Sequence, residues 1–182
     1  MPRITAIDPD QLDAEQRLVL EETVAGKRGR VPAPMNAWIK SPEYARRVQK
    51  LGEFLRYDTT LPPTLSELAI LLVARHWTSH YEWYAHKREG LKGGMDPEVI
   101  RAIAERSEPD FTTSKERAVY DVSKSLLEHR VVPDALYRTG VAELGEVGMV
   151  ELMGLLGFYT LVSMTLNTFE IGLPEGVEPE LV

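Results

Sequence analysis

Signals that open helices recur along almost the whole 182-residue chain, and they constrain its fold more than any other feature. Two of them, Ser41–Glu43 and Asp96–Glu98, place a capping residue before a proline and an acid. Three others have the capping-box spacing, with a hydroxyl residue three positions before a glutamate: Thr64 and Glu67, Ser79 and Glu82, Thr113 and Glu116. Few segments alternate like a strand, so we expect an all-α protein.

These signals divide the chain into about seven to eight predicted helices that form a single-domain bundle over residues 1–182. The glycine- and proline-rich segment Gly26–Ala37 is predicted to be a loop, and the tail from Ile171 to be extended. The helix after Thr64 is apolar nearly all round, which predicts burial. The predicted helices are Gln11–Ala25, Ser41–Arg56, Thr64 to a break near His76–Thr78, Ser79–Gly93, Asp96–Glu105, Thr113–Arg130, one from Pro133, and Val147–Phe169.

The net charge and two segments of the chain limit the kinds of partner and the location that we expect for the protein. A net charge of −7 argues against a nucleic-acid partner, because phosphate binding draws on a clustered excess of Lys and Arg. The N-terminal segment lacks the apolar core of a secretory signal, so we expect a cytoplasmic location. The stretch Val147–Phe169 is long enough to cross a membrane, but Glu151 and Asn167 interrupt it. We therefore expect a buried helix without a membrane partner, and a homo-oligomer that covers the most apolar helices.

The chain contains no cysteine. It therefore has no thiolate to act as a nucleophile, to bind a metal or to reduce a peroxide, and it forms no disulfide. Thiol chemistry is excluded by composition alone.

One predicted helix carries a group of residues suited to catalysis. Ser79, Glu82 and His86 are spaced i, i+3, i+7, so their side chains share one helix face. Glu82 lies four residues before His86, close enough to orient the imidazole and raise its pKa. The aromatic residues around this group would supply the dry walls of a small-molecule pocket: Trp77, Tyr81, Trp83 and Tyr84.

A simpler interpretation of the same residues remains open. Ser79 and Glu82 have the spacing of an ordinary helix cap, and His86 could pair with Glu82 on a solvated face. His76 and His80 are also four apart and could ligate a metal, but no suitably spaced third ligand follows. We therefore predict no metal site.

Four motifs resemble the carboxymuconolactone decarboxylase family, which shares its helical fold with the alkylhydroperoxidase-D proteins. The resemblance is strongest over about residues 45–105, and it is weaker in Gly26–Pro42 and Tyr120–Pro174. The motifs are Leu61-Pro-Pro-Thr-Leu-Ser-Glu67, Ala74-Arg-His-Trp77, Tyr81-Glu-Trp-x-x-His86 and Gly93-Gly-Met-Asp-Pro-Glu-Val-Ile100.

The alkylhydroperoxidase-D branch carries Cys-x-x-Cys, a histidine four residues later and an upstream acid that relays protons. The cysteine positions fall on Ser79 and Glu82 of this chain, the histidine on His86 and the acid on Glu67. A hydroxyl and a carboxylate cannot reduce a peroxide as a thiol pair does, so thiol peroxidase activity is excluded despite the shared fold.

The decarboxylase branch needs no thiol, and its members convert an unsaturated carboxylated lactone to an enol-lactone without a cofactor. The resemblance therefore implies a cofactor-free lyase that acts on a small carboxylated lactone or a related aromatic-degradation intermediate. In this interpretation His86 is the acid/base, oriented by Glu82, while Ser79, Arg75 and Trp83 contact the substrate. The alternative is a non-catalytic, oligomeric binding protein that keeps the fold.

The position of Glu67 tests this interpretation. In one straight helix, Glu67 and Ser79 would lie about 18 Å apart at ~1.5 Å per residue, too far to share a site. We therefore predict a break near His76–Thr78 that folds the chain back. The enzyme hypothesis further requires His86 to line a closed aromatic cavity, whereas a binding protein permits His86 on an exposed helix face.

Overall fold

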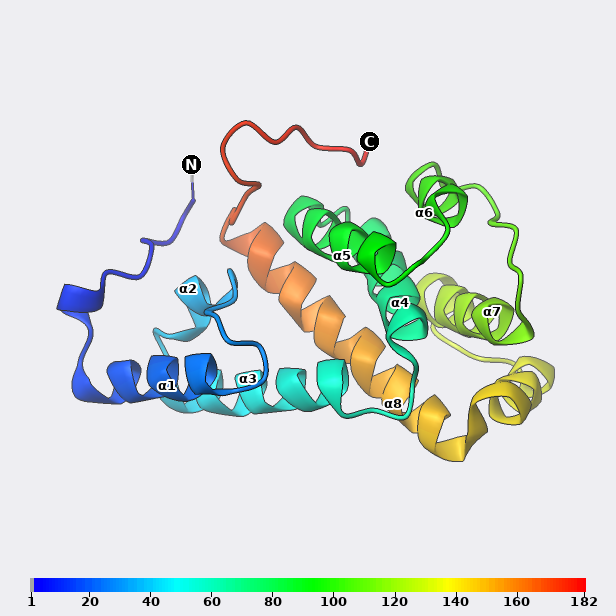
Figure 1. Ribbon diagram of the computed structural model, residues 1–182, viewed down its shortest axis with the longest axis horizontal. Coiled ribbons are helices and arrows are strands. Elements are labelled where there is room, and N and C mark those ends of the chain that lie inside the picture. Colours follow the sequence, from blue (N-terminus) through cyan, green and yellow to red (C-terminus); the bar gives the residue numbers. More distant parts are fainter. Residues whose placement is uncertain (1) are drawn as a thin grey trace.

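The computed structural model describes residues 2–182, and over that range it contains helices but no strands (Figure 1). This confirms the all-α prediction. Along the described chain, a short 3-10 helix, Pro9–Gln11, precedes eight α-helices: α1 (Ala14–Ala25), α2 (Met35–Trp38), α3 (Pro42–Tyr57), α4 (Pro63–His76), α5 (His80–Lys92), α6 (Pro97–Ala104), α7 (Ser114–His129) and α8 (Asp134–Thr168). The sequence did not predict the 3-10 helix, nor α2 within the expected loop.

Helix caps account for part of this pattern. Thr113 and Glu116 form the predicted capping box of α7, and the Asp96 side chain accepts a bond from the Glu98 amide at the start of α6. The other two predicted boxes are wrong. Helix α4 begins one residue early, after Pro62, and Ser79 at the start of α5 makes no side-chain capping bond. The carboxylates of these two failed boxes are therefore available for other contacts.

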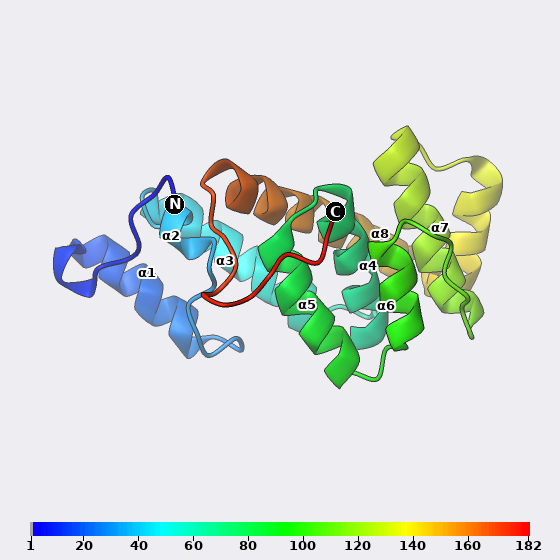
Figure 2. The ribbon, with the colours of Figure 1, turned by 90° about the horizontal axis from the view of Figure 1, so that it is seen from above.

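Helix α4 lies at the centre of the molecule, with α8 on one side and α7 on the other (Figures 1 and 2). As predicted from its apolar surface, it is buried, with ten of its 14 residues inaccessible. Its fully covered residues include Leu68, Ile70 and Leu71. Burial of each such side chain stabilises the fold by about 1.5–3 kcal/mol. A rigid central helix of this kind holds its polar residues in fixed positions.

Helix α8 is two helical segments joined at Gly145, whose backbone angles of φ 74° and ψ 168° lie outside the helical region. Glycine reaches this conformation without the steric cost that a side chain would add. Among residues 2–182, α8 is the one helix long and apolar enough for a membrane span, with a mean hydropathy of 1.6 in its most apolar window. Half of that window is buried within the protein, and α8 as a whole packs against α3, α4, α5 and α7.

Helices α3 and α8 approach each other closely at Gly52. A Cβ atom added there would lie 2.4 Å from Cζ of Phe158, so a side chain at this position would displace the phenyl ring. The close approach brings the C-terminal half of α3 beside α8. Arg56, one turn after Gly52, and Tyr159, the residue after Phe158, are thereby brought within hydrogen-bonding distance of each other.

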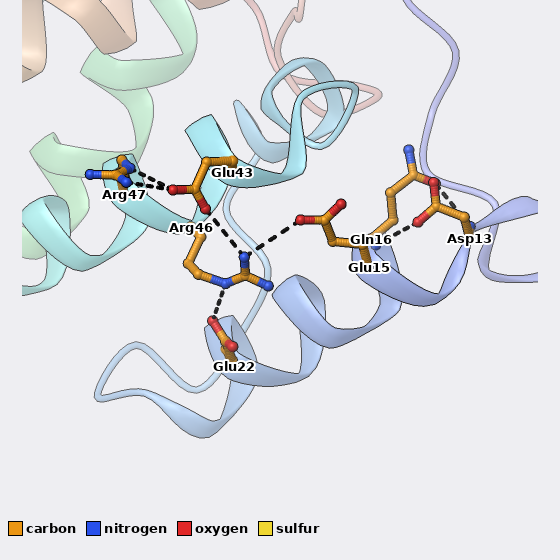
Figure 3. A network of polar contacts seen from close by, with 7 residues as sticks. All are labelled: Asp13, Glu15, Gln16, Glu22, Glu43, Arg46 and Arg47. Carbon is orange, nitrogen blue, oxygen red and sulfur yellow. Dashed lines mark hydrogen bonds and ion pairs between the residues drawn. The ribbon is translucent and has the colours of Figure 1, made fainter.

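An ion-pair network fastens α1 to α3 (Figure 3). The guanidinium of Arg46 on α3 lies 3.1 Å from a carboxylate oxygen of Glu22 and 3.7 Å from one of Glu15, both on α1. Immediately after α1, the amide of Lys27 donates to Glu53 of α3 at 2.8 Å. These contacts hold the loop 26–34 against α3.

Candidate active site

The chain reverses between α4 and α5, as predicted. Helix α4 ends at His76, and Thr78 adopts a left-handed conformation with φ 47°, which is unusual for a β-branched residue. The amide of Ser79 donates to the carbonyl of Ala74 at 2.8 Å and closes the turn. Helix α5 then runs back beside α4. Glu67 and His86, 19 residues apart in sequence, come into direct contact.

His86 lies between two carboxylates. Its Nδ1 is 2.6 Å from Oε2 of Glu67 and forms a hydrogen bond with it, while its Nε2 is 2.9 Å from Oε1 of Glu82. All three side chains are almost fully buried, with exposed fractions of 5% for His86, 11% for Glu67 and 7% for Glu82. Glu67 and Glu82 are the acids of the two failed capping boxes, so both carboxylates bind the imidazole instead of helix amides.

Arg56 and Tyr159 complete the cluster, and neither was predicted from the sequence. Arg56 Nη2 lies 3.3 Å from Oε1 of Glu67, and its Nη1 donates to the Tyr159 hydroxyl at 3.2 Å. The same Nη1 is 3.1 Å from both ring nitrogens of His86. The Tyr159 ring meets the imidazole edge-to-face, with centroids 4.9 Å apart. Helices α3, α4, α5 and α8 each contribute to the cluster.

The electrostatics of the cluster favour a protonated His86. Burial lowers the pKa of His86, but the nearby charges of Glu67 and Glu82 outweigh burial and leave the pKa raised. The positive charge of Arg56 disfavours protonation of His86, but Glu67 also pairs with Arg56 and compensates that charge. Burial raises the pKa of Tyr159 to about 12, so this phenol stays neutral. With His86 charged, two cations balance two carboxylates.

A cavity of about 50 Å³ opens beside this cluster. Both His86 and Glu82 line it, whereas Glu67 lies behind them. Nε2 faces Glu82, which lines the cavity, and Nδ1 faces Glu67, which does not. Arginines, aromatic residues and two further acids also line the cavity: Arg28, Arg30, Arg56, Trp38, Tyr81, Phe158, Tyr159, Glu53 and Glu89.

Three residues predicted to contact the substrate do not line this cavity. Arg75 lies near the C-terminal end of α4 and lines a different cavity, toward α6 and α7. Trp83 is buried and donates from Nε1 to Glu180 in the C-terminal tail at 3.2 Å. Ser79 is fully buried, and its hydroxyl has no partner within the described chain. The left-handed turn at Thr78 explains the positions of Arg75 and Ser79, because it separates them from the direction of α5. Trp83 lies on α5, but it contacts the C-terminal tail and does not line the cavity.

The predicted aromatic walls are also largely wrong. Of the four aromatic residues near His86 in sequence, Tyr81 alone lines the cavity, and the other rings come from α2 and α8. Over the part of the chain that the structure describes, no group of three or more acidic, histidine or cysteine side chains is arranged to hold a metal ion. The chemistry of the site therefore has to be considered from its acids, its imidazole and its arginines.

Three solved structures share the fold. An uncharacterized peroxidase-related protein with an alkylhydroperoxidase AhpD core, from Ralstonia eutropha JMP134, aligns at 16% identity and a TM-score of 0.77, covering 96% of this chain and 93% of that one. An uncharacterized peroxidase-related protein from Silicibacter sp. TM1040 aligns at 15% identity and a TM-score of 0.73, covering 94% and 90%. A protein of unknown function from Agrobacterium tumefaciens aligns at 20% identity and 0.68, covering 79% and 97%. These likenesses establish the fold.

The chain thus has the helical fold of an alkylhydroperoxidase AhpD core, and its histidine-centred site contains no thiol. Residues 42–125 match the model of the Carboxymuconolactone decarboxylase family, and the sequence contains no cysteine. The matched segment includes Arg56, Glu67, Glu82 and His86, while Tyr159 lies outside it. No curated protein matches the sequence.

Proposed function

We propose that the chain is a cofactor-free acid/base enzyme that decarboxylates a small carboxylated lactone or a related aromatic-degradation intermediate. The observation that carries the proposal is a buried histidine, held between two carboxylates, on the wall of a cavity that also contains arginines. Perturbed ionisable groups in a cleft are typical of catalytic sites. A non-catalytic binding protein would not require His86 to line an enclosed cavity.

The proposed reaction needs an anion anchor and a proton donor. Loss of CO₂ breaks the bond between the carboxylate carbon and the ring, and the electron pair passes into the conjugated lactone carbonyl. His86 then transfers the proton on Nε2 to the carbanionic carbon, becomes neutral, and regains a proton from water. Glu67 holds the proton on Nδ1 throughout. His86 is thereby returned to its protonated form, and the reaction needs no oxidant or reductant.

Arg28 and Arg30 are the proposed anchors for the substrate carboxylate, in place of Arg75. Both line the cavity from the loop 26–34, where Gly29 has a φ of 67°. A volume of about 50 Å³ holds a few water molecules, which a substrate would displace as it binds.

Replacing Arg28 with alanine is expected to raise KM for the carboxylated substrate about tenfold or more, because a charge-assisted hydrogen bond is lost. The value of kcat should change much less, since the proton donor is intact. The matched control is Arg101→Ala, which removes the same charge from an exposed position on α6. Equal effects of the two variants on KM would argue against anchoring by Arg28.

A turnover screen tests the function itself. Wild-type protein, treated with a chelator, is mixed with muconolactone-type carboxylic acids, and CO₂ release is followed. The proposal expects release from at least one compound. No release from any compound, with the protein folded, would contradict a decarboxylase and favour the binding protein. The cytoplasmic location stays a prediction that cell fractionation would check.

We also propose that the chain forms a homo-oligomer through α8. Val147, Val150 and Met164 are 59%, 72% and 50% exposed, and glycines 154 and 157 lie on the same exposed side. A second copy would remove this apolar surface from water. Sedimentation should show an oligomer for the wild type and a smaller species for Val150→Glu. A wild-type monomer at all concentrations would refute the proposal.

A further inference from the structure

A second cavity, of about 120 Å³, lies where α4, α6 and α7 meet. It is reached from the C-terminal end of α4, away from Glu67 and the His86 cavity. Part of its wall is apolar, from Leu72, Ile103 and Leu127. The rest is strongly cationic, because Arg75, Arg106 and Lys124 all line it.

Arg75 is the unusual member of this group. It is only 7% exposed, and its Nη2 donates to the main-chain oxygen of Val182 at 2.8 Å. Its Nε and Nη1 are buried and have no hydrogen-bond partner within residues 2–182. Burial lowers the pKa of Arg75, and the charge of Arg106 lowers it further. Two buried donor atoms of a charged guanidinium that lack hydrogen-bond partners are costly.

The neighbouring groups do not supply the missing partner. Lys124 donates to the Tyr120 hydroxyl at 3.3 Å. Glu128 is the one acid that lines the cavity, and within the described chain it forms no ion pair with Arg75, Arg106 or Lys124. The carbonyl groups at the C-terminal ends of α4 and α6 attract cations. They accept no hydrogen bond from Nε or Nη1 of Arg75.

We infer that this cavity, which we call the Arg75 cavity, binds the oxyanion head group of a small molecule, with the apolar body of the ligand against Leu72, Ile103 and Leu127. Arg75 has unsatisfied N–H donors for an oxyanion, and Arg106 and Lys124, which also line the cavity, add positive charge. This site is separate from the His86 cavity, and the inference does not depend on the decarboxylase proposal.

Calorimetric titration tests the inference, with inorganic phosphate and acetate as probes and chloride as the reference at constant ionic strength. We expect saturable binding of phosphate, acetate or both, and their ratio tells a phosphate site from a carboxylate site. Arg106→Ala and Lys124→Ala should each weaken binding about tenfold. Arg101→Ala, with the same loss of charge on α6, should leave the affinity within about twofold.

Arg75→Met provides the complementary test, because methionine fills much of the volume without a charge. It should abolish saturable binding. No binding by the wild type beyond that of chloride, or equal weakening by Arg101→Ala and Arg106→Ala, would overturn the inference. Unchanged binding by a folded Arg75→Met protein would overturn it as well. Circular dichroism of each variant establishes that it is folded.

Discussion

Replacing His86 with glutamine is expected to lower kcat for decarboxylation about 10²–10⁴-fold, the usual contribution of a general acid. Glutamine retains hydrogen-bonding capacity between Glu67 and Glu82 but cannot donate a proton as an imidazolium does. The value of KM should change little, because the proposed carboxylate anchors Arg28 and Arg30 remain. Steady-state kinetics on a substrate identified in the turnover screen measure both values.

The matched control for this variant is His129→Gln. His129 is exposed on α7, far from the cavity in sequence and outside its lining, so its loss should leave kcat unchanged. A folded His86→Gln protein with wild-type kcat would eliminate His86 as the proton donor. Activity lost only together with the folded structure would be recognised by circular dichroism.

Replacing Glu67 with alanine should lower the free energy of unfolding by about 3–5 kcal/mol, the cost of breaking a buried ion pair. Both Arg56 and His86 lose their carboxylate partner, and both are almost inaccessible to water. Chemical denaturation measures the change. Glu43→Ala is the control, because Glu43 pairs with Arg46 and Arg47 at the surface (Figure 3) and should matter far less. Similar losses in both variants would contradict a buried cluster.

The same cluster makes stability depend on pH. A histidine whose pKa is raised on folding stabilises the folded state fully below its unfolded pKa, about 6.5. This contribution is lost as the pH rises through the folded-state pKa. The free energy of unfolding of the wild type should therefore fall as the pH rises above about 6.5, and this fall should be absent in His86→Gln.

The helical fold could be predicted because its signals are local. Cap residues, prolines and glycines act within one or two helical turns, so the starts of α3, α6 and α7 followed from the sequence. The same rules failed at Thr64 and Ser79. There, Glu67 and Glu82 contact His86 instead of capping their helices. The local sequence pattern is the same in a box that forms and in one that does not, so it could not predict the difference.

The site was predicted only in part because half of it depends on distant contacts. Glu82 and His86 share a helix, and Glu67 followed from the family resemblance together with the predicted break. Arg56 and Tyr159 are 30 and 103 residues from their partners in the cluster, and nothing in the local sequence connects them. Arg75 was assigned by its distance along the chain from Ser79, which the turn at Thr78 made irrelevant.

The most direct test of the site is the protonation state of His86, measured by nitrogen NMR on protein labelled at its four histidines. Signals are assigned with the His86→Gln variant. At pH 7.5, where an ordinary histidine is mostly neutral, we predict that both ring nitrogens of His86 carry protons. In Glu67→Gln the midpoint of its titration should move to lower pH. A neutral His86 at pH 7.5 in the wild type, titrating with the exposed histidines, would contradict the proposed proton donor.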